Sequence, residues 1–220
     1  MNYQLILEEI EKEIQPFFNE GKVANYIPAL ATVNPNQFSM SVQMFDGTSF
    51  GVGEVNNKFS IQSISKVFTF TLALNHYGKE LYKRVGHEPS GNPFNSLVQL
   101  EYENGIPRNP FINAGAIVTA DSLVSIYKKN TFDTILDFIK KTSNDETISY
   151  DEEIFESELA NGFRNFALIN MIKSFNNINN NIDEVIDTYF KQCSIMMNCS
   201  QLAKSMLFLA NHGVHPLTNE

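Results

Sequence analysis

The chain has 220 residues, of which 43% are hydrophobic, enough to bury a core in one domain or in two lobes. Its net charge of −9 argues against nucleic acid or an anionic membrane surface as a partner. We expect a cytoplasmic protein, because no apolar run approaches membrane-spanning length, no basic leader precedes Glu8, and Cys193 and Cys199 fit neither a disulfide framework nor a zinc motif.

The N-terminal part of the chain shows one helical and one hairpin pattern. Residues 3–18 repeat apolar side chains at helical spacing, and residues 38–53 alternate apolar and polar side chains on either side of Asp46-Gly47, as in a β-hairpin. An isolated hairpin is only marginally stable. Either further strands are hidden in the sequence, or part of the sheet is missing from this chain.

From Gln62 onward the periodicity is mostly helical, with loops rich in Pro, Gly and Asn, including a surface connector at 176–181. We therefore predict an α+β protein, with a helix and hairpin of an α/β lobe in residues 1–61 and a mainly helical lobe in 62–220. The predicted helices of the second lobe lie near 63–77, 114–129, 131–142, 151–160, 164–175, 182–197 and 200–211.

Ser63 and Lys66 are three residues apart at the predicted start of a buried helix. Positions i and i+3 share a helix face, so lysine can take the serine proton while serine attacks a carbonyl. Burial and the positive helix N-terminus both lower the pKa of Lys66, which suits a base. The alternative is an N-cap serine followed by a lysine whose amine reaches solvent. The spacing alone does not decide between these two interpretations.

Other polar patterns carry less information. The same Ser-x-x-Lys spacing recurs from Ser125 to Lys128, just before Lys129-Asn130, and we interpret it as a solvated helix end. His212 and His215 have no carboxylate or cysteine at ligand spacing, so we expect no metal site.

Several ordered segments resemble the signatures of the serine-dependent glutaminases, among them Gln62-Ser63-Ile64-Ser65-Lys66. The resemblance runs from about residue 20 to the end of the sequence. It implies a fold like that of the serine β-lactamases and penicillin-binding proteins, with a helical lobe beside an antiparallel sheet. The segments that carry it are 21–31, 62–66, 86–91, 109–117, 157–158, 164–167 and 189–195.

The resemblance implies hydrolysis of L-glutamine to L-glutamate and ammonia. Ser63 is then the nucleophile, Lys66 the base that activates it, and the Ser63 backbone N–H a donor to the oxyanion. Tyr189 is implied to help move protons to the leaving ammonia. No cofactor or metal is expected, because these groups suffice for amide hydrolysis.

The resemblance also implies a set of residues that bind the amino-acid end of glutamine. Glu158 suits the α-ammonium by charge, and Asn113 and Asn165 suit the α-carboxylate as neutral donors. Tyr26 is implied to contact the same end, and Ser63 and Tyr189 complete the set. The implied partner is the small-molecule substrate, and the family analogy suggests a homo-oligomer.

The family pattern continues beyond the last residue of this sequence. It implies further sheet strands, a second active-site tyrosine, and a Ser-Gly-Val-type strand whose valine N–H is the second oxyanion donor. Three explanations stay open: a fragment of a longer enzyme, a truncated and inactive product, or a sheet completed by a partner chain. The alternatives to an active glutaminase are a module that binds amino acid or oligomerises without turnover, and a penicillin-recognising hydrolase.

Overall fold

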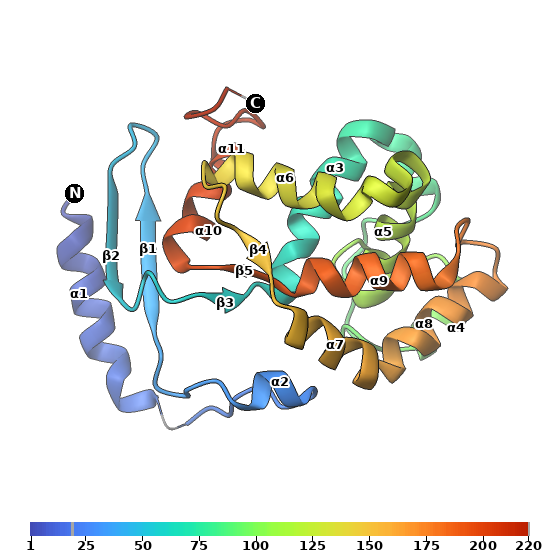
Figure 1. Cartoon of the computed structure of the whole chain (residues 1–220), viewed down its shortest axis with the longest axis horizontal. Coiled ribbons are helices and arrows are strands. Elements are labelled where there is room, and N and C mark those ends of the chain that lie inside the picture. The colour runs from blue at the N-terminus through green and yellow to red at the C-terminus, as the bar shows by residue number, and fades with distance from the viewer. Residues whose placement is uncertain (19, 220) are drawn as a thin grey trace. The chain divides into compact units, whose positions relative to one another are not determined.

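The computed structural model describes residues 1–18 and 20–219, and Figure 1 shows their helices and strands. They form two compact units. The first unit contains Met1–Ser60, Asp137–Ser149 and Met196–Glu220, and the second contains Ile61–Leu136 and Tyr150–Ile195. This grouping differs from the predicted division at residue 61, because 137–149 and 196–220 belong with the N-terminal residues.

A helix and a hairpin begin the first unit, as predicted. Strands β1 (Ser39–Gln43) and β2 (Ser49–Gly53) pair antiparallel, and α1 (Tyr3–Ile14) packs on β2, as Figure 1 shows. The predicted helix over 3–18 ends earlier, at Ile14, and continues as the 3₁₀ helix η1 (Gln15–Phe17). Proline at position 16 explains the change, because it lacks the backbone N–H that an α-helix needs.

Short strands hidden in the sequence form a second sheet. Its order is β3–β5–β4, with β3 (Phe59–Ser60), β4 (Ser149–Tyr150) and β5 (Ile195–Met197). The predicted helix over 182–197 is therefore wrong at its C-terminal end, since α9 (Ile182–Cys193) stops before β5. Three apolar residues fit a helix and a strand equally well. The capping box at Asn198, which begins α10 (Cys199–Ser205), closes the segment.

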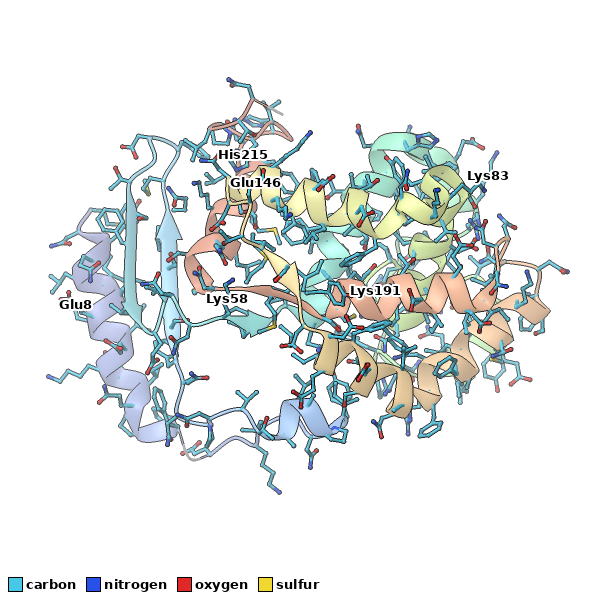
Figure 2. The ribbon with its side chains drawn as sticks, viewed as in Figure 1. Glu8, Lys58, Lys83, Glu146, Lys191 and His215 are labelled. Carbon is cyan, nitrogen blue, oxygen red and sulfur yellow. The ribbon has the colours of Figure 1, made fainter. Side chains whose placement is uncertain are left out.

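The second unit is built around α5 (Asn113–Tyr127), which packs against α3 (Ser65–Tyr77), α8 (Phe163–Ser174) and α9. A helix buried on nearly every side needs mostly apolar residues, and α5 has them on most of its surface, with Thr119, Asp121 and Ser122 as buried polar exceptions. Helix α7 (Glu152–Asn161) packs on α9, where the Lys191 ammonium lies 5.1 Å from the centroid of the Phe155 ring. Figure 2 labels Lys191 on α9. The remaining elements are α2 (Pro28–Ala31), η2 (Gln62–Ile64), η3 (Gly78–Lys83), α4 (Val98–Tyr102), η4 (Lys128–Asn130), α6 (Thr131–Ser143) and α11 (Leu207–Ala210).

The asparagine-rich connector at 176–181 is not the plain surface loop that its composition predicts. Asn177 is buried, and the backbone N–H groups of Asn179 and Asn180 both donate to the buried carboxylate of Asp121. Arg84 pairs with the same carboxylate over 2.5 Å. The loop is thus tied to α5 by a buried charge.

No helix within residues 1–18 and 20–219 is long and apolar enough to span a membrane.

Candidate active site

Lys66 lies in the first turn of α3, and only 1% of its surface is exposed. Its Nζ donates to the Phe111 carbonyl at 2.9 Å and to Asn113 Oδ1 at 2.8 Å. Burial lowers the pKa of Lys66 to about 8, although Cys193 opposes the shift. A neutral amine has two N–H groups and one lone pair. Both N–H groups therefore have an acceptor, and the lone pair is left to take a proton.

Ser63 lies on the 3₁₀ helix η2, one turn before Lys66, and is exposed. Lys66 lies three residues later in α3, a spacing at which side chains of a continuous helical segment are neighbours. Within the described residues no hydrogen bond joins the Ser63 hydroxyl to the Lys66 amine.

The structure contradicts the alternative that Ser63 is an N-cap and that the Lys66 amine reaches solvent. Ile61 caps η2 and Ile64 caps α3, so Ser63 is not a capping residue. The Lys66 amine does not reach solvent, because it is bonded inside the unit to Phe111 and Asn113. Neither half of that alternative therefore applies.

Asn113 connects Lys66 to a third helix. It is the first residue of α5, and its Nδ2 donates to Asn165 Oδ1 at 3.0 Å, in the first turn of α8. Ile112, not Asn113, is the N-cap of α5, so the Asn113 side chain serves this network and not the helix end. One row of hydrogen bonds therefore runs Lys66–Asn113–Asn165.

Tyr189, Glu158 and Lys66 all act on the thiol of Cys193. All three side chains are buried, and Tyr189 and Cys193 are one turn apart on α9. Burial and the Glu158 carboxylate raise the pKa of Cys193 to about 12, while the charge of Lys66 and the neighbouring Ser65 and Tyr189 hydroxyls lower it. The thiol therefore stays protonated and unreactive at neutral pH.

The structure brings most of the predicted site residues into one unit and leaves one elsewhere. Tyr26 belongs to the first unit, where it is 60% exposed, and its part in substrate binding stays a prediction. The sequence analysis missed the buried neighbours Ser65, Gln192 and Cys193, although Ser65 lies inside the Ser-x-x-Lys motif. The residues gathered in the second unit are Ser63, Lys66, Asn113, Glu158, Asn165 and Tyr189.

The second Ser-x-x-Lys pair has a structural use. Ser125 Oγ donates to the Asp121 carbonyl at 3.0 Å and accepts from Asn180 Nδ2 at 2.7 Å. Lys128 is exposed just after the end of α5. The interpretation of this copy as a helix end is confirmed. Within the described residues, no three His, Cys, Asp or Glu side chains are grouped so as to hold a metal ion.

Comparisons with known proteins agree on one family. The sequence model of the family described as Glutaminase matches residues 21–220. A glutaminase of Aliarcobacter butzleri (strain RM4018) is 81% identical over the whole chain, which covers 72% of that protein.

Solved structures of glutaminases have the same fold. The probable glutaminase of Bacillus subtilis superposes with a TM-score of 0.89 at 32% identity, and the match covers 100% of this chain and 68% of that one. The Bacillus subtilis protein complexed with 6-diazo-5-oxo-L-norleucine gives a TM-score of 0.85 at 32% identity, covering 100% and 67%. The predicted α+β fold is confirmed, and the chain belongs to the glutaminase family.

Proposed function

We propose that Ser63 and Lys66 carry out the glutaminase reaction in this chain, with L-glutamine as the substrate. The observation that supports this most is the buried Lys66, whose pKa is about 8 and whose two N–H groups are bonded. A lysine in that state is a base near neutral pH. The exposed serine three residues earlier supplies the nucleophile.

The reaction follows from these groups in two halves. Ser63 Oγ attacks the side-chain amide carbon of glutamine, and Lys66 takes the hydroxyl proton. The Ser63 N–H, in the first turn of a helix where backbone donors have no intrahelical acceptor, donates to the oxyanion. Ammonia leaves with a proton delivered through Tyr189, and a γ-glutamyl ester remains on Ser63. Water then hydrolyses this ester, releasing L-glutamate and restoring the hydroxyl.

The amino-acid end of the substrate is proposed to meet Glu158, Asn113 and Asn165. Asn113 Oδ1 and Asn165 Oδ1 already accept hydrogen bonds, so these amides present N–H groups, which suit a carboxylate. Glu158 is buried, and its charge suits the α-ammonium. Tyr26 is proposed as a further contact from the family resemblance alone.

Two further proposals concern the setting of the protein. The family analogy suggests a homo-oligomer. A reducing compartment such as the cytoplasm is suggested by Cys193 and Cys199, which are both free thiols.

The test is ammonia release from L-glutamine by the purified chain, with Ser63→Ala beside it and Ser125→Ala as the matched control. We expect ammonia release that Ser63→Ala abolishes and that Ser125→Ala leaves within about twofold, because the Ser125 hydroxyl is bonded to Asp121 and Asn180, outside the proposed site. Release that survives Ser63→Ala overturns the assignment of the nucleophile.

A second measurement separates binding from turnover. The diazo ketone 6-diazo-5-oxo-L-norleucine keeps the amino-acid end of glutamine, and a nucleophile can displace its nitrogen to form a covalent bond. Addition to Ser63 without ammonia release identifies the module that binds without turnover. If a folded chain shows neither ammonia release nor covalent addition to Ser63, the proposed function is overturned.

A further inference from the structure

The residue directly before Ser63 has a strained backbone. Gln62 has φ of +43°, a conformation that residues other than glycine rarely adopt. Such a residue persists only where its surroundings hold it. Two donors hold its carbonyl, and both come from Ser65: the backbone N–H, and the hydroxyl at 2.6 Å.

A second helix holds Ser65 in turn. Ser65 and Gln192 of α9 are both fully buried, and Gln192 Nε2 lies 3.3 Å from Ser65 Oγ. A serine hydroxyl has one hydrogen, and Ser65 gives it to the Gln62 carbonyl. Ser65 Oγ must therefore accept from Gln192. A buried chain of hydrogen bonds runs from Gln192 through Ser65 to the strained peptide that carries Ser63.

These hydrogen bonds connect the two ends of the proposed proton path, Ser63 and Tyr189. Gln192 is three residues after Tyr189 on α9, and the thiol of Cys193, on the same helix, is influenced by the side chains of both Ser65 and Tyr189. The turn that presents the nucleophile is thus fixed to the helix that carries the tyrosine. Helix α9 also packs directly on η2.

We propose that Ser65 and Gln192 are positioning residues that hold the Gln62–Ser63 turn in register with Tyr189. The proposal rests on the proposed role of Ser63 as the nucleophile. It assigns a use to the second serine of the Ser-Ile-Ser-Lys motif. Gln192 donates to Ser65 through its amide nitrogen, while Gln192 Oε1 has no hydrogen-bond partner among the described residues. A buried amide oxygen without a hydrogen bond lowers the stability of the fold, so packing alone does not explain a glutamine at this position.

The test compares Ser65→Ala with Ser205→Ala. Ser205 lies in the other unit and is also fully buried. Its hydroxyl donates to the Leu202 carbonyl, three residues earlier, at 2.8 Å, so Ser205→Ala removes the same kind of bond as Ser65→Ala. We expect Ser65→Ala to lower kcat at least about tenfold with KM within about twofold, because small misplacements of reacting groups are costly. Ser205→Ala should leave both constants within about twofold. Equal kcat in the two variants, or a change in KM alone, overturns the proposal.

Gln192→Met removes the amide while keeping the side-chain length, and it carries the test if Ser65→Ala does not fold. We expect Gln192→Met to lower kcat, and the double variant to be no slower than Ser65→Ala, because Gln192 acts through the Ser65 hydroxyl. If the fold-losses in kcat of the two single variants multiply in the double variant, Gln192 does not act through Ser65, and the proposal is contradicted.

Amide hydrogen exchange tests the positioning without turnover. If the unmodified chain releases no ammonia, the proposed function is at fault, and the turn is followed directly. The Ile64 amide donates to the Ile61 carbonyl at 2.9 Å, inside the turn that Ser65 braces. Ser65→Ala should speed its exchange at least about tenfold, while Ser205→Ala leaves it unchanged. Unchanged exchange in Ser65→Ala overturns the proposal.

Discussion

The rate of glutamine hydrolysis should rise with pH through the titration of Lys66. Only the neutral amine can take the Ser63 proton, and burial lowers the pKa of Lys66 from 10.5 to about 8. With that value, about 1% of the lysine is neutral at pH 6, about 9% at pH 7 and about 90% at pH 9. The value of kcat/KM should therefore rise about tenfold from pH 6 to pH 7, and about tenfold again from pH 7 to pH 9.

The assay is ammonia release at low glutamine concentration across this pH range, because kcat/KM reports groups in the free protein. The plateau should begin near pH 9. A profile that still climbs tenfold per pH unit above pH 9 means that Lys66 keeps its ordinary pKa, and a flat profile from pH 6 to pH 9 means that Lys66 is not the base. Either result refutes the proposed role.

The same pKa shift predicts the pH dependence of stability. Between pH 8 and pH 10.5 the unfolded chain holds a proton on Lys66 that the folded chain has lost, so the free energy of unfolding rises with pH in this window. The full shift corresponds to about 3 kcal/mol. Denaturant unfolding gives the free energy of unfolding of the unmodified chain and of Lys66→Met at each pH, and the difference between the two should show this rise. A difference that does not change with pH contradicts the lowered pKa.

Four further substitutions test the site and the fold. Lys66→Ala should nearly abolish ammonia release and Lys128→Ala should leave it close to unchanged, so a strong effect of Lys128→Ala would mean that the wrong pair was chosen. Asp121→Ala removes the buried carboxylate that accepts from Arg84 and from the asparagine-rich loop, and denaturant unfolding should show a loss of about 3–5 kcal/mol. A loss below about 1 kcal/mol, the size expected for an exposed ion pair, would refute this account of the loop. A Cβ at Gly115 would lie 1.9 Å from the Asn109 carbonyl oxygen, so Gly115→Ala should cost about 1–3 kcal/mol, and an unchanged melting temperature would show that the backbone yields there.

Long periodic segments were predictable from the sequence because their apolar pattern is dictated by burial. Helix α3 and the hairpin follow that pattern, and so does the lowered pKa of Lys66, which needs only a buried amine. Short segments lack such a signal. The three residues of β5 were predicted as helix because a short apolar run fits both periods.

Contacts set by tertiary structure were not predictable. Asparagine-rich sequence is typical of solvated loops, and nothing local indicates that Asp121, more than fifty residues earlier, binds its backbone. The strained φ of Gln62 has a similar origin, since the Ser65 hydroxyl that holds its carbonyl is itself held by Gln192, 127 residues later in the sequence. The spacing of Ser63 and Lys66 predicted that pair, whereas the other site residues came from the family resemblance, because their separate positions in the sequence carried no geometric information.

The discontinuous first unit has a consequence for synthesis of the chain. All residues of the second unit precede Met196, whereas α10, which packs on β1 of the hairpin, follows it. During translation the hairpin can pack on α1 at once, but β1 gains its contact with α10 only after about 150 further residues are made, and contacts so distant in sequence form slowly. The second unit can close around α5 while the ribosome is still adding the residues that complete the first. The turn that carries Ser63 can thus form before β1 has its contact with α10.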